Sequence, residues 1–367
     1  MEKDVMINPA GKDKISGFLM SLTGKRLVAT LLSAIGLAII PILATMIDGN
    51  FSNSPIKVDA VDDIGRVAAY LLGLPTAILI LAKYSGKFPL VLEQLKQNKV
   101  IVLTDSEWND FKISANNIFD KSLYSKTPHF IALIITLYLI VHYFNSPVWF
   151  SVRLDSGFYF AAYLQIPVYY LTYYTYSLCI FNIIASYVVL RELFSNYKIS
   201  LQPLHPDNCG GLLALGDLSN RLNIGIVVIG IISGLNIYMD HKLLGGPLLN
   251  FHHILIITGY IIGAYIVFFM PLYAAHESMK AAKFDEIKRI NDYFLTVNQK
   301  LKDRLNNNAN IDPRDMNDFE NINKIYDLVK KMPVYPFNIA TVTSFIGSLF
   351  IPILLFLVER ILQSLIH

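Results

Sequence analysis

Long apolar runs alternate with shorter polar segments along the chain. Seven of these runs carry almost no charge over roughly the 20 residues that a helix needs to cross a hydrocarbon layer. Within a bilayer a helix satisfies its own backbone hydrogen bonds, so apolar runs of this length favour helices. The pattern predicts an all-α, polytopic membrane protein with seven transmembrane helices, at residues 27–47, 67–83, 129–144, 158–190, 224–239, 251–273 and 338–358.

The polar segments carry helical patterns of their own. Thr104-Asp105-Ser106-Glu107 is a capping box and predicts a helix between the second and third runs. Between 276 and 332, apolar residues three and four positions apart predict two antiparallel helices that form a hairpin before the last run. A short amphipathic helix lying along the membrane is predicted from Leu212, Leu215, Leu218 and Leu222.

Lysine and arginine positions predict the orientation. They gather in the first 26 residues and in the segments after the second, fourth and sixth runs, which the positive-inside rule assigns to the cytosol. We expect a cytosolic N-terminus, an outer C-terminus and a cytosolic hairpin. The predicted organisation is a cytosolic segment 1–26, a six-helix membrane region 27–275 with cytosolic loops 85–127 and 191–222, a hairpin 276–337, and the last helix with its outer tail, 338–367.

Composition agrees with a membrane location. The chain is 54% hydrophobic and only 16% charged, whereas soluble domains carry about 25% charged residues. The net charge of +3 arises from basic residues beside the runs, so it does not indicate a nucleic-acid partner. The two cysteines lie in unrelated places and predict no disulfide framework. The bilayer of the plasma or inner membrane is the expected partner.

The stretch 204–212 concentrates chemical groups between two apolar runs. His205, Asp207 and Cys209 are residue types that bind zinc, but a fourth ligand and a conventional spacing are missing. We therefore predict no metal, no cofactor and no catalytic residue. The stretch is interpreted as a rigid corner in which Asp207 or its neighbour caps the next helix and Gly210 and Gly211 allow close packing. A site for an anion or a lipid phosphate on the glycine amides is the alternative.

The predicted spans hold almost no ionisable residue near their centres. His142, His252 and His253 fall near predicted outer ends, where interfacial histidines are ordinary. Because ionisable residues inside spans usually mark coupled transport, this pattern argues against a proton- or sodium-coupled carrier.

Small and polar residues recur on single helix faces. Asn338, Thr341, Ser344 and Ser348 form a seam along the last run, which suits either a pore lining in an oligomer or tight helix packing. Two close-packing pairs, Gly230 with Gly234 and Gly259 with Gly263, indicate either packing of the fifth and sixth spans on each other or an oligomer interface.

Two motifs carry a resemblance. His205-Pro206-Asp207 with Gly210-Gly211-Leu212, and Pro333-Val334-Tyr335-Pro336-Phe337 before the last run, resemble an uncharacterised group of prokaryotic multi-pass membrane proteins. The predicted topology alone also resembles the seven-helix cation channels of the insect odorant-receptor type.

These patterns lead to a first functional hypothesis. It is a non-enzymatic, homo-oligomeric, channel-like membrane protein that assembles through the hairpin and the last helix, with the last helix lining a path. One alternative is a membrane sensor or effector whose cytosolic face binds a protein or small ligand without conducting. A third hypothesis is an intramembrane metal enzyme built on His205 and Cys209.

Overall fold

The computed structural model describes most of the chain. The described residues are 6–9, 14–52, 58–143, 148–149, 159–197, 199–200, 205, 207, 209–244, 250–306, 313–336 and 342–350. Within them the regular structure is helical, apart from two isolated bridges that join Val58 to Val148 and Ile101 to Ile199. The helices are α1 (Lys14–Met20), α2 (Gly24–Ile47), α3 (Ile64–Gln97), α4 (Asp105–Phe119), α5 (Ser122–His142), α6 (Phe160–Asn196), α7 (Leu213–Leu244), α8 (Phe251–Asn306) and α9 (Pro313–Lys331). Residues 342–350 are also helical.

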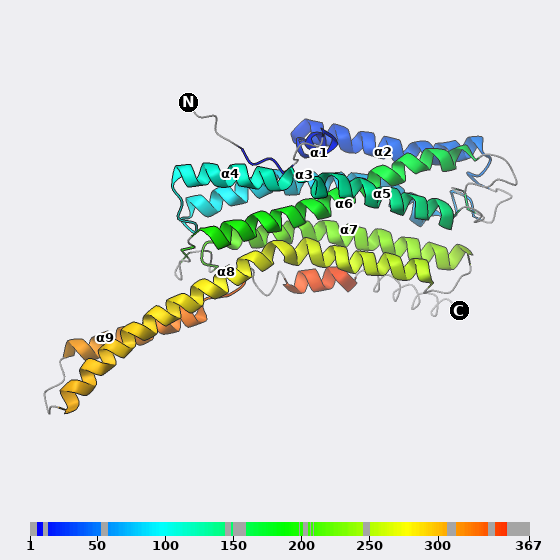
Figure 1. Ribbon diagram of the computed structural model, residues 1–367. Helices are drawn as coiled ribbons and strands as arrows, with labels where there is room; N and C mark the ends of the chain where they lie inside the picture. Colours follow the sequence, from blue (N-terminus) through cyan, green and yellow to red (C-terminus); the bar gives the residue numbers. More distant parts are fainter. Residues whose placement is uncertain are drawn as a thin grey trace, which may run out of the picture.

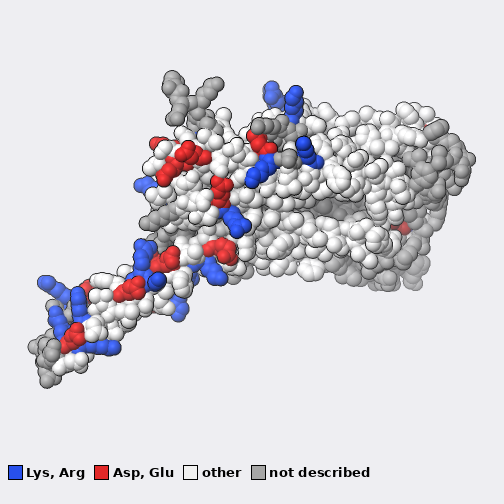
Figure 2. Space-filling view, viewed as in Figure 1, with Lys and Arg blue, Asp and Glu red and all other residues white. Residues whose placement is uncertain are grey.

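The helices form an elongated bundle with a projecting arm (Figure 1). Helices α2 to α8 run along the bundle, and α8 continues beyond it to form the arm with α9. We call the end where α8 leaves the bundle the arm end, and the opposite end the far end. On the visible face, Lys, Arg, Asp and Glu gather on the arm and toward the arm end, whereas the described surface toward the far end is almost free of them in this view (Figure 2).

Within the described residues, six helical segments are long and apolar enough to cross a membrane, which indicates a multi-pass membrane protein. The seventh predicted span, 338–358, lies mostly outside the described residues, of which 342–350 are helical. The predicted orientation stays a prediction. The six segments are Gly24–Ile47, Gly65–Gln97, Asp105–His142, Phe160–Asn196, Leu213–Leu243 and Phe251–Asn306.

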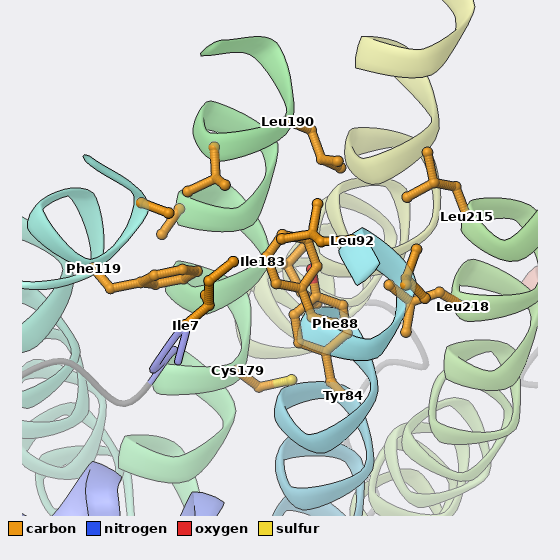
Figure 3. Close-up of a cluster of buried hydrophobic side chains, with 14 of the residues drawn as sticks. Ile7, Tyr84, Phe88, Leu92, Phe119, Cys179, Ile183, Leu190, Leu215 and Leu218 are labelled. Carbon is orange, nitrogen blue, oxygen red and sulfur yellow. The ribbon is translucent and has the colours of Figure 1, made fainter. Parts of the chain in front are cut away.

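The largest apolar core lies toward the arm end (Figure 3). Tyr84 and Phe88 of α3 stack with ring centroids 6.0 Å apart, and Phe119 of α4 meets Phe88 edge-on. The predicted capping box at the start of α4 is confirmed, because the Thr104 hydroxyl accepts from the Glu107 amide and the Glu107 carboxylate accepts from the Thr104 amide. The capping box thus fixes where α4 begins, and Phe119 packs the helix against α3.

Two predicted helix boundaries are wrong. The short helix expected along the membrane at 212–222 is instead the first part of one unbroken helix, α7. Its leucines Leu215, Leu218 and Leu222 are buried in the main core, so packing against the bundle holds this segment in line with the span. Likewise α8 runs without a break from 251 to 306, through the expected boundary at 275.

The arm is built from the last part of α8 and from α9. Val297 and Leu301 of α8 pack against Ile322 of α9, and the rings of Phe294 and Phe319 lie 5.2 Å apart. The two apolar stripes predicted from the sequence therefore face each other. That they lie in the cytosol stays a prediction.

The returning chain is bound to α8 at the base of the arm. Lys283 Nζ donates to the carbonyls of Lys330 and Met332 at 2.7 Å each. The His276 ring stacks on Tyr335 at 4.0 Å, and His276 Nδ1 lies 2.7 Å from the Val334 carbonyl. Movement of α8 at this level is thus linked to the segment that leads into residues 342–350.

Candidate functional site

The far end of the bundle contains a network of buried ionisable side chains. Helices α3, α5, α7 and α8 each place side chains in it, from the first turn of α3, the end of α5, the last turns of α7 and the first turn of α8. We call these side chains the buried polar cluster: Asp63, Arg66, Tyr143, Asp240, His252 and His253. All six are at least nine-tenths buried.

Arg66 is the centre of the cluster. Its Nε lies 2.9 Å from Asp63 Oδ2, three residues earlier, and its Nη2 donates to Asp240 Oδ1 on α7. The guanidinium also lies over the Tyr143 ring, 5.4 Å from the centroid. One cation therefore pairs with two carboxylates, Asp63 at the start of α3 and Asp240 near the end of α7, and the second pair joins the two helices.

Asp240 extends the network to α8. Its Oδ2 lies 3.3 Å from His253 Nε2 and accepts from the Tyr143 hydroxyl at 3.4 Å. The same hydroxyl lies 3.2 Å from His252 Nε2. Burial raises the pKa of the Tyr143 phenol well above its usual value, so the hydroxyl keeps its proton and remains a donor.

Aromatic rings surround these charges. The Trp149 indole N–H donates to Asp63 Oδ2 at 3.3 Å, and its backbone N–H donates to the Val58 carbonyl. The rings of His142 and His252 stack 4.1 Å apart. These contacts exclude water from the ion pairs, which strengthens their electrostatic interaction and raises the cost of an unbalanced charge.

The charges of the cluster are unequal, since two carboxylates face one guanidinium. Asp63 precedes the candidate span of α3, and burial raises the pKa of its carboxyl to about 6, although Arg66 and the Trp149 N–H act in the opposite direction. The carboxyl is therefore a group that gains and loses a proton close to neutral pH.

Sequence reasoning missed this cluster. It assigned Asp63 and Arg66 to a connecting segment, ended the fifth span at Met239, and treated His252 and His253 as interfacial. The three-residue spacing of Asp63 and Arg66 was the available local signal, because it brings both side chains onto the first turn of α3. Nothing in the sequence connects them to Asp240, which is 174 positions from Arg66.

The described residues of the stretch 204–212, which are 205, 207 and 209–212, form a compact corner at the arm end. Asp207 Oδ1 accepts from the backbone amides of Cys209 at 2.8 Å and Gly211 at 3.0 Å, and Oδ2 accepts from Leu213, the first residue of α7, at 3.2 Å. His205 Nδ1 lies 2.8 Å from the same carboxylate. Pro206 of the motif, and Asn208, the neighbour of Asp207 that was the other candidate for the helix cap, lie outside the described residues.

The two glycines have steric roles in this corner. Gly210 and Gly211 adopt φ values of 66° and 94°, which favour glycine. A Cβ on Gly211 would lie 2.3 Å from Val100 Cγ2, in the segment that follows α3. The corner therefore requires glycine at 211 both for its backbone conformation and for its contact with Val100.

The corner itself engages or protonates the groups that the chemical alternatives would use. Asp207 already accepts from the Gly211 and Leu213 amides, which an anion or lipid phosphate would need. Burial raises the pKa of the Cys209 thiol to about 11, so it is protonated and a poor nucleophile or metal ligand. Among the described residues no group of three or more His, Cys, Asp and Glu side chains is arranged to hold a metal ion.

The polar seam of the last helix is partly described. Asn223 of α7 donates to Ser344 Oγ at 2.9 Å and accepts from Ser348 Oγ at 2.8 Å, so these two hydroxyls bond within the subunit. Asn338 and Thr341 lie outside the described residues. Thr343, Ile346, Gly347 and Phe350 are exposed and form a different face of the helix.

The four glycines of the close-packing pairs have different surroundings. Gly230 is buried and Gly234 half-buried on α7. On α8, a Cβ at Gly263 would lie 3.9 Å from Ile180 of α6, whereas one at Gly259 would meet nothing within 4 Å. The Gly259 position is therefore open to a neighbouring molecule or to lipid.

Comparisons with models of protein families, with curated proteins and with solved structures found no significant match to this chain.

Proposed function

We propose that the protein is a non-enzymatic, homo-oligomeric, channel-like protein of the cell membrane, in which the arm joins subunits and the last helix borders the path. The observation that carries this proposal is that two consecutive elements, the arm and residues 342–350, each leave a face uncovered. The following contacts support it.

The arm exposes large apolar side chains although it is otherwise strongly charged. Phe284, Leu295 and Leu305 of α8 and Met316 and Leu328 of α9 are each between 47% and 69% exposed. Contact with lipid tails does not explain these exposed apolar side chains, because the arm also carries many Lys, Arg, Asp and Glu residues, which are costly to place in the hydrocarbon layer. A second copy of the arm would cover these side chains.

The last helix is attached to its own subunit by one side. Phe345 stacks on Phe268 of α8 at 4.1 Å, and the Tyr260 hydroxyl donates to the Ser348 carbonyl at 3.0 Å. The remaining side presents Thr343 and Gly347, which are small, next to Ile346 and Phe350. In this proposal the path runs along that face, whereas Ser344 and Ser348 hold the helix to α7.

Light scattering of the purified protein in mild detergent tests the assembly. We expect more than one chain per particle, and a weaker assembly in Leu295→Glu. Thr296→Glu, which adds the same charge at the neighbouring exposed position, is the matched control and should assemble normally. A wild-type protein that is monomeric under these conditions would contradict the proposal.

Ion flux from liposomes tests the path. A Cβ at Gly347 or at Gly36 of α2 would meet nothing within 4 Å, so both positions accept a larger side chain. We expect Gly347→Leu to reduce flux several-fold and Gly36→Leu to leave it unchanged. Equal flux in both variants would exclude the last helix as the border of a path.

A non-conducting sensor is the second candidate, and the continuity of α8 favours it. This helix of 56 residues extends about 80 Å, from His252 and His253 in the buried polar cluster to the tip of the arm. A change at the far end would thus reach the arm through one continuous helix. Absence of flux from wild-type liposomes, together with a cytosolic partner cross-linked to the arm, would favour this function over the channel.

A further inference from the structure

We propose that the buried polar cluster is a proton-binding site in which Asp63 takes up a proton as its surroundings acidify, and that this proton strengthens the contact of α3 with α7 and α8 at the far end. The proposal does not depend on ion conduction or on oligomerisation. It rests on the composition, burial and connectivity of the cluster.

The first step concerns charge balance. Asp63 and Asp240 are at most 5% exposed and both pair with the guanidinium of Arg66. With both carboxylates ionised the cluster holds excess negative charge away from water, which is costly. A proton on Asp63 leaves one carboxylate opposite one guanidinium and removes that excess.

The second step concerns the other groups that could take the proton. Every helix around the cluster contributes titratable groups. His142 and His252 stack 4.1 Å apart, so two protonated rings there would repel each other. His253 lies against Asp240 on the α8 side, whereas Asp63 lies on the α3 side of Arg66. The groups are Arg66 and Tyr70 of α3, Tyr138, His142 and Tyr143 at the end of α5, Tyr169 of α6, Asp240 of α7, and His252 and His253 of α8.

The third step gives the direction of the effect. Burial raises the pKa of the Asp63 carboxyl to about 6, above the ordinary value of 3.8. The folded protein then binds this proton more tightly than the unfolded chain does, so its stabilisation of the far end is fully present below about pH 4 and is lost as pH rises from there to about 6. This pH dependence is opposite to that of an aspartate stabilised as its anion, which contributes less to stability as pH falls.

Trp149 is a built-in reporter of this proton, because its indole N–H donates to Asp63. The chain has two tryptophans, so Trp108→Phe leaves Trp149 as the one fluorophore of its kind. In lipid nanodiscs between pH 4.5 and 8 we expect its emission to change with a midpoint of about 6. The transition should vanish in Trp108→Phe/Asp63→Asn and persist in Trp108→Phe/Asp62→Asn, which removes the neighbouring exposed carboxylate.

A second variant, Asp240→Asn, tests the proposal even if Asp63→Asn fails to fold. Asp240→Asn keeps Asp63 buried but removes a nearby like charge that adds to the effect of burial on its pKa, so the Trp149 midpoint should move to lower pH. An unchanged midpoint in Asp240→Asn, a transition that survives Asp63→Asn, or the lack of any transition in Trp108→Phe would each overturn the proposed proton site.

The effect of the proton on the contact between α3 and α7 is tested with spin labels at two exposed positions, Val61 before α3 and Lys242 on α7. The distance distribution should be narrow at pH 5 and broader or longer at pH 8, and independent of pH in Asp63→Asn. Identical wild-type distributions at both pH values, with a normal Trp149 transition, would refute the effect on helix contact while leaving the proton site in place.

Discussion

The corner at 205–213 and the buried polar cluster at the far end both fix helices with aspartate, but in different ways. Asp207 accepts from backbone amides within six residues of itself. Asp240 bonds to Arg66, 174 positions away, and Asp63 accepts from Trp149 in addition to its pairing with the nearby Arg66. The first arrangement is local in sequence, and the second exists only after the helices have packed.

This difference has a chemical consequence. A carboxylate held by amides is stabilised as its anion, and although burial acts to raise it, the amides of Cys209, Gly211 and Leu213 together with His205 hold the pKa of Asp207 below its ordinary value. Asp63 must share a guanidinium with a second carboxylate, and its pKa is raised. Similar residue types thus serve as a permanent corner at one end and as a proton-responsive contact at the other.

Removal of Arg66 should have the largest effect. In Arg66→Met, Asp63 and Asp240 stay buried without their cation, and we expect a loss of about 3–5 kcal/mol in the free energy of unfolding. Unfolding in mixed micelles measures this loss. Arg66→Met/Asp240→Asn should recover part of it, and exposed Arg26→Met should lose little. A loss below about 1 kcal/mol for Arg66→Met would show that the cluster is not a coupled network.

The corner should respond mainly to shape. Gly211→Val combines an unfavourable backbone conformation with the contact to Val100, so we expect a loss of about 2–4 kcal/mol. Gly259→Val, at an open helical position, is the control and should lose less than about 1 kcal/mol. Thermal unfolding compares the two, and equal midpoints would count against the steric role of Gly211.

The two aspartates should give opposite dependence on pH. The contribution of Asp207 to stability is present above its ordinary pKa near 3.8 and is lost as pH falls below it. The contribution of Asp63 is lost as pH rises from about 4 to about 6. The free energy of unfolding should therefore be measured from pH 3 to 8. In Asp207→Asn its decrease at the acid end should disappear, and in Asp63→Asn its decrease between about pH 4 and 6 should disappear. The same change of profile in both variants would remove the distinction between the two ends.

Changes to the reactive-looking side chains of the corner should have the smallest effect. We expect Cys209→Ser to lower the free energy of unfolding by about 1 kcal/mol or less, well below the effect of Gly211→Val. Elemental analysis of wild type, His205→Ala and Cys209→Ala should find no stoichiometric metal in any of them. A metal present in the wild type and absent from either variant would restore the metal-enzyme hypothesis.

The sequence by itself determined the features that depend on nearby residues. Apolar runs predicted the long helices because span length follows directly from the thickness of the hydrocarbon layer. Thr104 and Glu107 predicted the start of α4, since a capping box joins residues three apart. Facing stripes such as Val297 and Ile322 predicted the pairing within the arm, because helical periodicity places them on one side.

Tertiary packing decided the rest. The leucines from Leu215 to Leu222 fit a helix on the membrane surface as well as a buried one, and contact with the core selected an unbroken α7. Ser344 and Ser348 fit a pore lining as well as helix packing until Asn223 was placed beside them. Arg66 and Asp240 become partners only when α3 and α7 meet, because a charge network between distant helices leaves no periodic or local pattern in the chain.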